Sequence, residues 1–128
     1  MAELHVGLVA ADHEVWTGDA SMVIARTVEG DIGILPGHEP LLAVLADGPV
    51  RIRPVDGPEI VAAVHGGFLS VSESGVSVLA EVAELSTEID VSRAQRSLEE
   101  ARSAGADDAE AEAARRRAET RIRVAQAG

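Results

Sequence analysis

The spacing of apolar residues changes near Ser86, and this change limits what the chain can fold into. Before it, short apolar runs alternate with polar residues and are separated by glycine and proline, as in strands joined by tight turns. Leu4, Val6 and Leu8, for example, share one face of a predicted strand. Beyond Ser86, apolar residues recur every three or four positions, the period of a helix. The sequence therefore predicts a β-sandwich or flattened barrel over residues 1–86 and a helical tail over residues 87–128.

The tail is expected to form two helices. The first begins after Asp90, a residue type favoured as an N-cap, and ends at Gly105, while Asp107-Asp108 can cap the second. The apolar faces of both helices are mostly alanine. Because alanine buries little surface, at about 25 cal/mol per Å², the hairpin should hold only weakly to its neighbour. We therefore expect the hairpin to be mobile.

The stretch Gly30–Leu45 is the stiffest feature of the β region. Gly30 and Gly33 allow positive φ on both sides of a two-residue extended piece, and Pro36-Gly37 requires a turn. The apolar run Leu41–Leu45 then predicts a buried strand. Such a rigid, polar-tipped corner is typical of segments that present side chains to a partner. Trp16, the only tryptophan, is expected to plug the core or an interface.

Composition narrows the function classes. The net charge is −11, lysine and cysteine are absent, and the acidic residues 1–86 contain almost no aromatic side chains. This surface offers neither counterion release nor base stacking, so nucleic-acid binding is disfavoured. We expect a soluble, cytoplasmic chain, because no apolar run is long enough to span a membrane and the first residues are not those of a signal peptide.

The sequence carries no motif typical of catalysis or metal binding. The chain has no Walker loop, no nucleophile elbow and no thiol. His38 beside Glu39 fits an exposed or interface histidine better than an acid–base pair. No two histidines have metal-ligand spacing; they are His5, His13, His38 and His65. We therefore expect a chain that is not an enzyme by itself and holds no metal or catalytic cofactor.

Three motifs, in order along the chain, resemble the epsilon subunit of the bacterial F-type ATP synthase, of the actinobacterial kind. They are Gly-x-x-Gly-Ile-Leu-Pro-Gly-His-x-Pro-Leu at Gly30–Leu41, Gly66-Gly67-Phe68-Leu69-Ser70-Val71 followed by Val76-Ser77-Val78-Leu79-Ala80, and Ile89-Asp90-x-x-Arg93-Ala94. The resemblance implies an N-terminal β-sandwich of two antiparallel, five-stranded sheets and a C-terminal two-helix hairpin.

The same resemblance implies a non-catalytic rotor subunit of the central stalk, peripheral to the cytoplasmic face of the bacterial cell membrane. Its implied roles are to couple c-ring rotation, driven by proton transport, to ATP synthesis in the catalytic head, and to inhibit ATP hydrolysis. Its implied partners are the gamma subunit of the central stalk, the membrane-embedded c-ring and, transiently, the catalytic beta and alpha subunits. The residues themselves leave an alternative open, a free-standing β-sandwich that binds a small molecule or peptide and uses the helical tail for packing.

Three sets of candidate contact residues follow from the resemblance. The implied ring contact is Asp31, Ile32, His38 and Glu39. The implied site for regulatory ATP is Ile89, Asp90, Arg93 and Ala94, where a helix N-terminus and an arginine can meet phosphate. The implied contact with the catalytic subunit is Arg115, Arg116, Arg117, Arg121 and Arg123, which outnumber the nearby acids on their helix. In each set a local role remains open: a turn cap, a helix cap or a solvated charged face.

Overall fold

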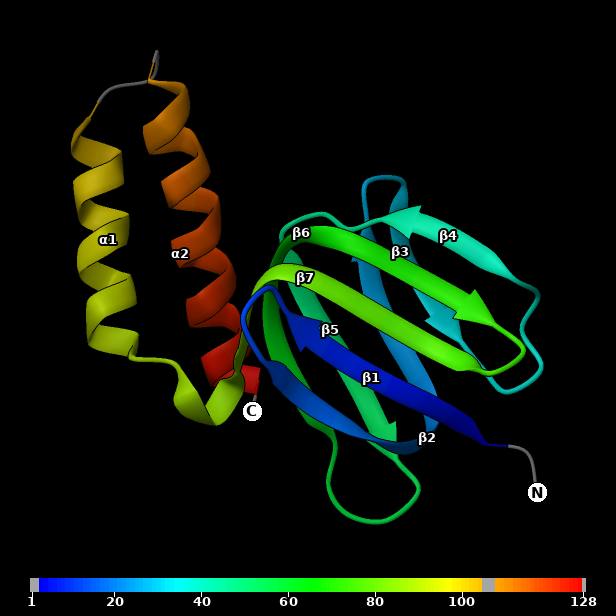
Figure 1. Ribbon diagram of the computed structural model, residues 1–128. Helices are drawn as coiled ribbons and strands as arrows, with labels where there is room; N and C mark the ends of the chain where they lie inside the picture. The colour runs from blue at the N-terminus through cyan, green and yellow to red at the C-terminus, as the bar shows by residue number, and fades with distance from the viewer. Residues whose placement is uncertain (1–2, 105–107, 128) are drawn as a thin grey trace.

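The computed structural model describes residues 3–104 and 108–127. Strands and helices follow the expected order, with all the strands before the helices (Figure 1). The strands are β1 (Leu4–Ala10), β2 (Glu14–Thr27), β3 (Gly30–Ile34), β4 (Leu41–Val44), β5 (Gly48–Pro54), β6 (Ile60–Ser72) and β7 (Gly75–Leu85). A short 3-10 helix (Ser86–Glu88) leads to α1 (Val91–Ser103) and α2 (Ala109–Ala127).

The strands form a sheet that folds over itself. They hydrogen-bond in the order β1-β7-β6-β5-β2-β3, β4 pairs with β6, and β1 also pairs with β2, which closes the β domain. Long strands serve both layers: one end of β6 pairs with β5 and the other with β4. The expected sandwich and helical hairpin are confirmed. In detail, the β1–β7 pair is parallel, whereas the resemblance implied antiparallel sheets throughout.

Two strands run without interruption through glycines, the residue type that often ends a strand. β2 runs without interruption from Glu14 to Thr27, because Gly18 lies inside the strand with the Trp16 ring stacked over it; a Cβ there would come within 2.9 Å of that ring. Trp16 is partly buried against the main core, as expected. β6 likewise continues through Gly66 and Gly67, both with positive φ. A Cβ at Gly67 would lie 2.0 Å from the Leu79 carbonyl oxygen, so these glycines let β6 and β7 approach closely.

The core confirms the alternation read in the first strand and corrects the reading of Leu41–Leu45. Leu4, Val6 and Leu8 are all buried in the main core, as predicted. The run Leu41–Leu45 is not buried throughout: Leu42 is 71% exposed. β4 has β6 on one side only and one open face, so its alternate residues point outward. An apolar run therefore did not imply burial on both faces.

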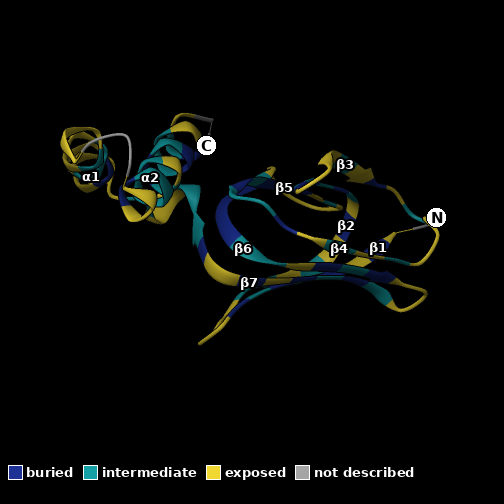
Figure 2. Cartoon of the chain, turned by 90° about the horizontal axis from the view of Figure 1, so that it is seen from above, coloured by how far each residue is buried: buried dark blue, intermediate teal, exposed yellow. Residues whose placement is uncertain are grey.

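The hairpin packs against one end of the β domain, and α2 is the helix that contacts it (Figures 1 and 2). The contact has a small core of its own, formed by Val61, Ala63 and Val124 with Ile89 against it. This cluster is much smaller than the core of the sandwich. A small apolar contact was expected from the alanine-rich faces, and the weak attachment of the hairpin stays a prediction.

Aspartates cap both helices. Asp90 Oδ1 accepts a hydrogen bond from the Arg93 backbone N–H at 3.0 Å. Asp108 Oδ1 accepts from the backbone N–H groups of Glu110 and Ala111 at 3.0 and 3.1 Å. Both caps were expected from sequence. The predicted helix end at Gly105 and the cap alternative at Asp107 lie outside the described residues.

Candidate functional site

The predicted corner joins β3 to β4. Leu35–His38 form a tight turn, in which the His38 backbone N–H donates to the Leu35 carbonyl at 3.1 Å and Gly37 has φ of +85°. Gly30 has positive φ as predicted, but Gly33 does not. Gly33 lies inside β3, where a Cβ would come within 3.0 Å of the Met22 methyl group. A glycine at position 33 therefore allows close packing against Met22 and is not needed for an unusual backbone angle.

Asp31 forms a cross-strand ion pair. It lies opposite Arg26 in the β2–β3 ladder, and Arg26 Nε donates to its Oδ1 at 2.9 Å. This hydrogen bond lowers the pKa of the Asp31 carboxyl. Arg26 is fixed in turn by packing over Gly48, where a Cβ would lie 2.8 Å from its Cδ. Asp31 therefore presents a carboxylate that is oriented by, and paired with, the Arg26 guanidinium.

The four candidate ring residues do not form one cluster. His38 and Glu39 are exposed together in the turn, and the His38 Nδ1–H donates to the Glu39 carbonyl at 2.7 Å. Both line a hollow of about 540 Å³, whose further acidic lining residues are Glu3, Asp19 and Glu73. Asp31 and Ile32 lie on β3 outside that hollow, and Ile32 is partly buried against the main core.

An apolar row on the outer face of the sheet was missed by the sequence reading. In register across four strands lie Val9, Leu79, Phe68 and Val44, from β1, β7, β6 and β4. Phe68 is 51% and Leu79 48% exposed. Leu42 extends the row along β4. The sequence did contain a sign of this row. In β4, β6 and β7 both the odd-numbered and the even-numbered positions carry apolar residues, so each strand has two apolar faces although the core covers only one.

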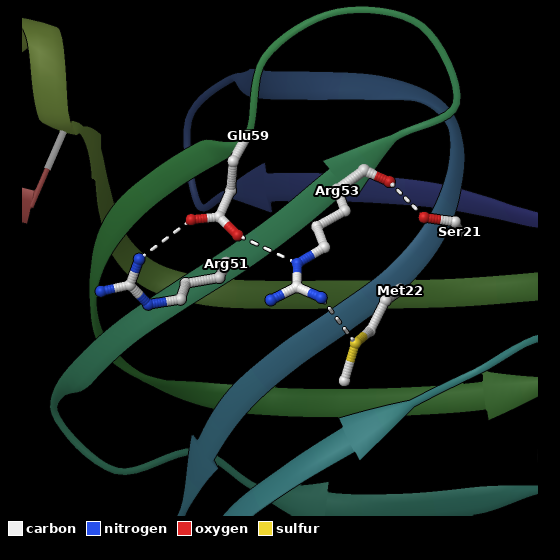
Figure 3. A network of polar contacts seen from close by, with 5 residues as sticks. All are labelled: Ser21, Met22, Arg51, Arg53 and Glu59. Carbon is white, nitrogen blue, oxygen red and sulfur yellow. Dashed lines mark hydrogen bonds and ion pairs between the residues drawn. The ribbon is translucent and has the colours of Figure 1, made fainter.

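The outer face of β5 carries a small polar network instead (Figure 3). Glu59 accepts hydrogen bonds from Arg51 Nη1 at 3.0 Å and from Arg53 Nε at 3.2 Å, and these bonds lower the pKa of Glu59. Arg53 Nη1 also lies 3.6 Å from the Met22 sulfur, and the Ser21 hydroxyl donates to the Arg53 backbone carbonyl. These arginines therefore have a partner within the β domain.

The five arginines of α2 have different surroundings. Arg115 pairs with Glu112 and Glu119 on its own helix, and Arg121 Nε pairs with Glu84 Oε1 of β7 at 2.5 Å. Arg117 is half-buried, and Arg116 and Arg123 are exposed. The sequence reading had left Arg121 without a partner, because Glu84 is distant along the chain. The arginines thus form no single surface while the hairpin is docked.

The candidate ATP residues meet beside α2. Asp90, Arg93 and Ala94 line a hollow of about 290 Å³, together with Glu84, Glu88, Ser97 and Arg121. Ile89 instead packs in the small Val124 cluster, and Ala94 is buried at the helix–helix contact. Arg93 and Arg121 are the arginines that line this hollow and could bind a phosphate. The carboxylates of Glu84, Glu88 and Asp90 line it too and would repel one. An anionic ligand would have to compete with Glu84 for Arg121.

Residues 3–104 and 108–127 contain no group of three or more histidine, aspartate or glutamate side chains placed to hold a metal ion. No helix in these ranges is both long and apolar enough to cross a membrane.

Comparison with known proteins gives consistent matches over both parts of the chain. Residues 3–86 match the family described as "ATP synthase, Delta/Epsilon chain, beta-sandwich domain". The chain is 62% identical over 124 residues to the ATP synthase epsilon chain of Streptomyces coelicolor, covering 97% of this chain and 96% of that one. It is 50% identical over 122 residues to the epsilon chain of Corynebacterium diphtheriae, covering 93% and 99%.

Solved structures agree with these matches. A chain in the cryo-EM structure of the Euglena gracilis mitochondrial ATP synthase (OSCP/F1/c-ring) has a TM-score of 0.74 and 28% identity, covering 98% of this chain and 79% of that one. A chain in the Tetrahymena thermophila mitochondrial ATP synthase central stalk and c-ring has a TM-score of 0.66 and 18% identity, covering 96% and 93%. At that identity the second match supports the fold alone.

Proposed function

Because this chain belongs to the ATP synthase delta/epsilon family and is a non-catalytic epsilon chain of the F-type central stalk, we propose that it couples c-ring rotation to the catalytic head and inhibits ATP hydrolysis. We assign coupling to residues 1–86 and inhibition to residues 87–128, in a peripheral protein at the cytoplasmic face of the bacterial cell membrane. The alternative of a free-standing binding module is set aside, since the likeness to epsilon chains covers 97% of this chain, tail included.

The observation that carries the coupling proposal is the exposed apolar row of Val44, Phe68 and Leu79. A soluble domain gains nothing by exposing a half-accessible phenylalanine among aliphatic neighbours, and such patches mark protein interfaces. We assign the row to the gamma subunit of the central stalk. The corner with His38 and Glu39 lies at the end of the β domain where β1 begins, far from the hairpin (Figure 1). One face can thus hold the shaft while the corner reaches the c-ring.

Substitution of Phe68 tests the assignment to gamma. Phe68→Ser should reduce the amount of this chain that stays with the purified complex, because a central aromatic side chain often dominates an interface. Val55→Ser is the matched control, since Val55 is 47% exposed in the connection between β5 and β6, where its backbone N–H donates to Asp19 and not to a residue of the row. Equal retention of both variants would contradict the assignment.

Asp31 tests the ring contact. Asp31→Lys should lower proton pumping per ATP hydrolysed while leaving the melting temperature of the isolated chain nearly unchanged, because the Arg26–Asp31 pair is exposed and worth at most about 1 kcal/mol. Glu29→Lys makes the same charge change at an exposed position two residues away. If Asp31→Lys unfolds the chain without a specific loss of coupling, Asp31 is only a structural residue.

The tail is assigned to inhibition through transient contact with the beta and alpha subunits. Arg116, Arg117 and Arg123 have no ion-pair partner among the described residues, so release of the hairpin would present them to an acidic surface together. Deletion of residues 106–128 should raise ATP hydrolysis by the purified complex, more at low salt than at high salt, because exposed charges are screened. Unchanged hydrolysis at every salt concentration would leave these arginines a solvated face.

Regulatory ATP is proposed for the hollow beside Arg93. Millimolar ATP should raise the melting temperature of the isolated chain, and Arg93→Ala should abolish that shift. Arg96→Ala is the control, since Arg96 is an exposed arginine further along α1 that does not line the hollow. If ATP stabilises neither the parent nor the control, the motif serves only to begin α1.

A further inference from the structure

His65 is an unusual residue for the middle of a strand. It is 4% exposed, and neither ring nitrogen has a hydrogen-bond partner among the described residues. It follows Val61 and Ala63 at the same parity along β6, so it shares the face on which Val124 of α2 packs. A buried imidazole without partners is costly, and the function proposed above does not use it.

Charged groups from three elements face the His65 ring. Arg117 and Arg121 approach it from α2, Glu84 from β7, and Asp47 from the connection between β4 and β5. Asp47 Oδ1 lies 3.8 Å from the ring Nδ1, too far for a hydrogen bond, and Glu84 is engaged by Arg121. A proton on the buried His65 ring would therefore place a third positive charge close to two arginines.

We propose that His65 is a proton-operated latch: neutral, it lets α2 dock on β6, and protonated, it drives α2 away. Release of α2 would hydrate the ring and remove both arginines at once. His65 thus lies at the contact between β6 and α2, where the gain of one proton would weaken the packing of the hairpin on the β domain. Its consequence for ATP hydrolysis rests on the proposed inhibitory role of the tail, whereas the latch itself belongs to this chain alone.

The direction of the effect follows from linkage. Burial and, next, Arg121 lower the pKa of His65 from its ordinary 6.5, while Asp47 and Glu84 oppose that change. In the released state the ring is hydrated and its pKa returns toward 6.5. Docking is therefore fully stabilised above about pH 6.5 and weakens as pH falls toward the docked pKa. The docked-to-released ratio falls by up to about tenfold for each unit that separates the two pKa values.

Distance measurements on the full chain test this latch. The chain has no cysteine, so spin labels can be attached at Ser74→Cys, in the β6–β7 turn, and at Gln126→Cys, near the end of α2, both exposed. Between about pH 8 and about pH 5.5 a longer-distance population should grow as His65 takes up a proton. His65→Gln should abolish that growth. His13→Gln, which removes an exposed histidine from the β1–β2 turn, should leave it intact.

A titration of the histidine rings by NMR covers the case in which His65→Gln does not fold. In the parent chain the His65 ring should titrate below 6.5. Titration at or above 6.5, a distance distribution independent of pH, or an unchanged pH response in folded His65→Gln would each overturn the latch. If docking follows pH and hydrolysis by the assembled enzyme does not, the latch stands and the proposed inhibition by the tail fails.

Discussion

Replacement of Val124 by alanine should release the hairpin from the β domain without unfolding either part. Val124 is fully buried, and among the described residues it is the α2 side chain in the small cluster with Val61 and Ala63. The main core of the sandwich does not include this cluster. The substitution therefore acts on the contact between the two parts of the chain.

The size of the effect follows from the groups removed. Val124→Ala deletes two buried methyl groups at about 0.8 kcal/mol each, and the small cavity left behind brings the cost to about 1.5–2.5 kcal/mol. The Arg121–Glu84 ion pair across the same contact, with side chains about 30% exposed, is present in parent and variant alike and therefore leaves this difference unchanged. The docked-to-released ratio should fall about ten- to seventy-fold.

Spin labels at Ser74→Cys and Gln126→Cys report that ratio directly as the fraction of long distances. The melting temperature of the β domain should change little. In the assembled enzyme the freed hairpin should make hydrolysis slower, because the tail reaches its inhibitory position more often.

Val91→Ala provides the matched control. It removes the same two methyl groups, but from an exposed side chain in the first turn of α1. Its distance distribution should match that of the parent. If Val124→Ala left the distances unchanged, the docking contact would depend on something other than the Val124 cluster, and the description of the hairpin as weakly held would be wrong.

Two further predictions concern the β domain. Gly67→Ala should lower the free energy of unfolding by about 3 kcal/mol or more, because the added Cβ would meet a carbonyl oxygen at a residue with positive φ. Thermal melting measures this loss. The control is Gly7→Ala, whose Cβ meets open space and which should stay within about 1 kcal/mol of the parent. Glu59→Gln should cost at most about 1 kcal/mol at neutral pH. Because the folded-state pKa of Glu59 is lowered, that difference should be present above 4.5 and vanish as pH falls below the folded value; a difference that grows in acid would contradict the ion pair.

Alternation and turn chemistry predicted most of the fold. The buried face of Leu4, Val6 and Leu8 and the cap at Asp90 followed from local rules that operate within a few residues. Glycines were the main source of error. Gly66 and Gly67 permit close approach of a neighbouring strand, and from the sequence this use looks the same as a strand break.

The candidate sites were harder to read because they depend on pairings between distant segments. Nothing near Arg121 in the sequence indicates Glu84, which lies 37 residues away along the chain. The exposed row through Phe68 appears only when the strand register is known. Local patterns can place residues on a face, but they do not identify the partner that faces them.

The measurement that tests the account most directly is ATP hydrolysis by the assembled enzyme with the hairpin locked in its docked position. Cysteines at Ala63 and Val124, which pack in the same cluster, should form a disulfide in this otherwise cysteine-free chain. The unsubstituted enzyme, taken through the same oxidation and reduction, controls for thiols elsewhere. We predict that oxidation raises hydrolysis toward the level of the 106–128 deletion and that reduction reverses the increase. Hydrolysis that is the same with the hairpin locked and free would contradict regulation by this tail.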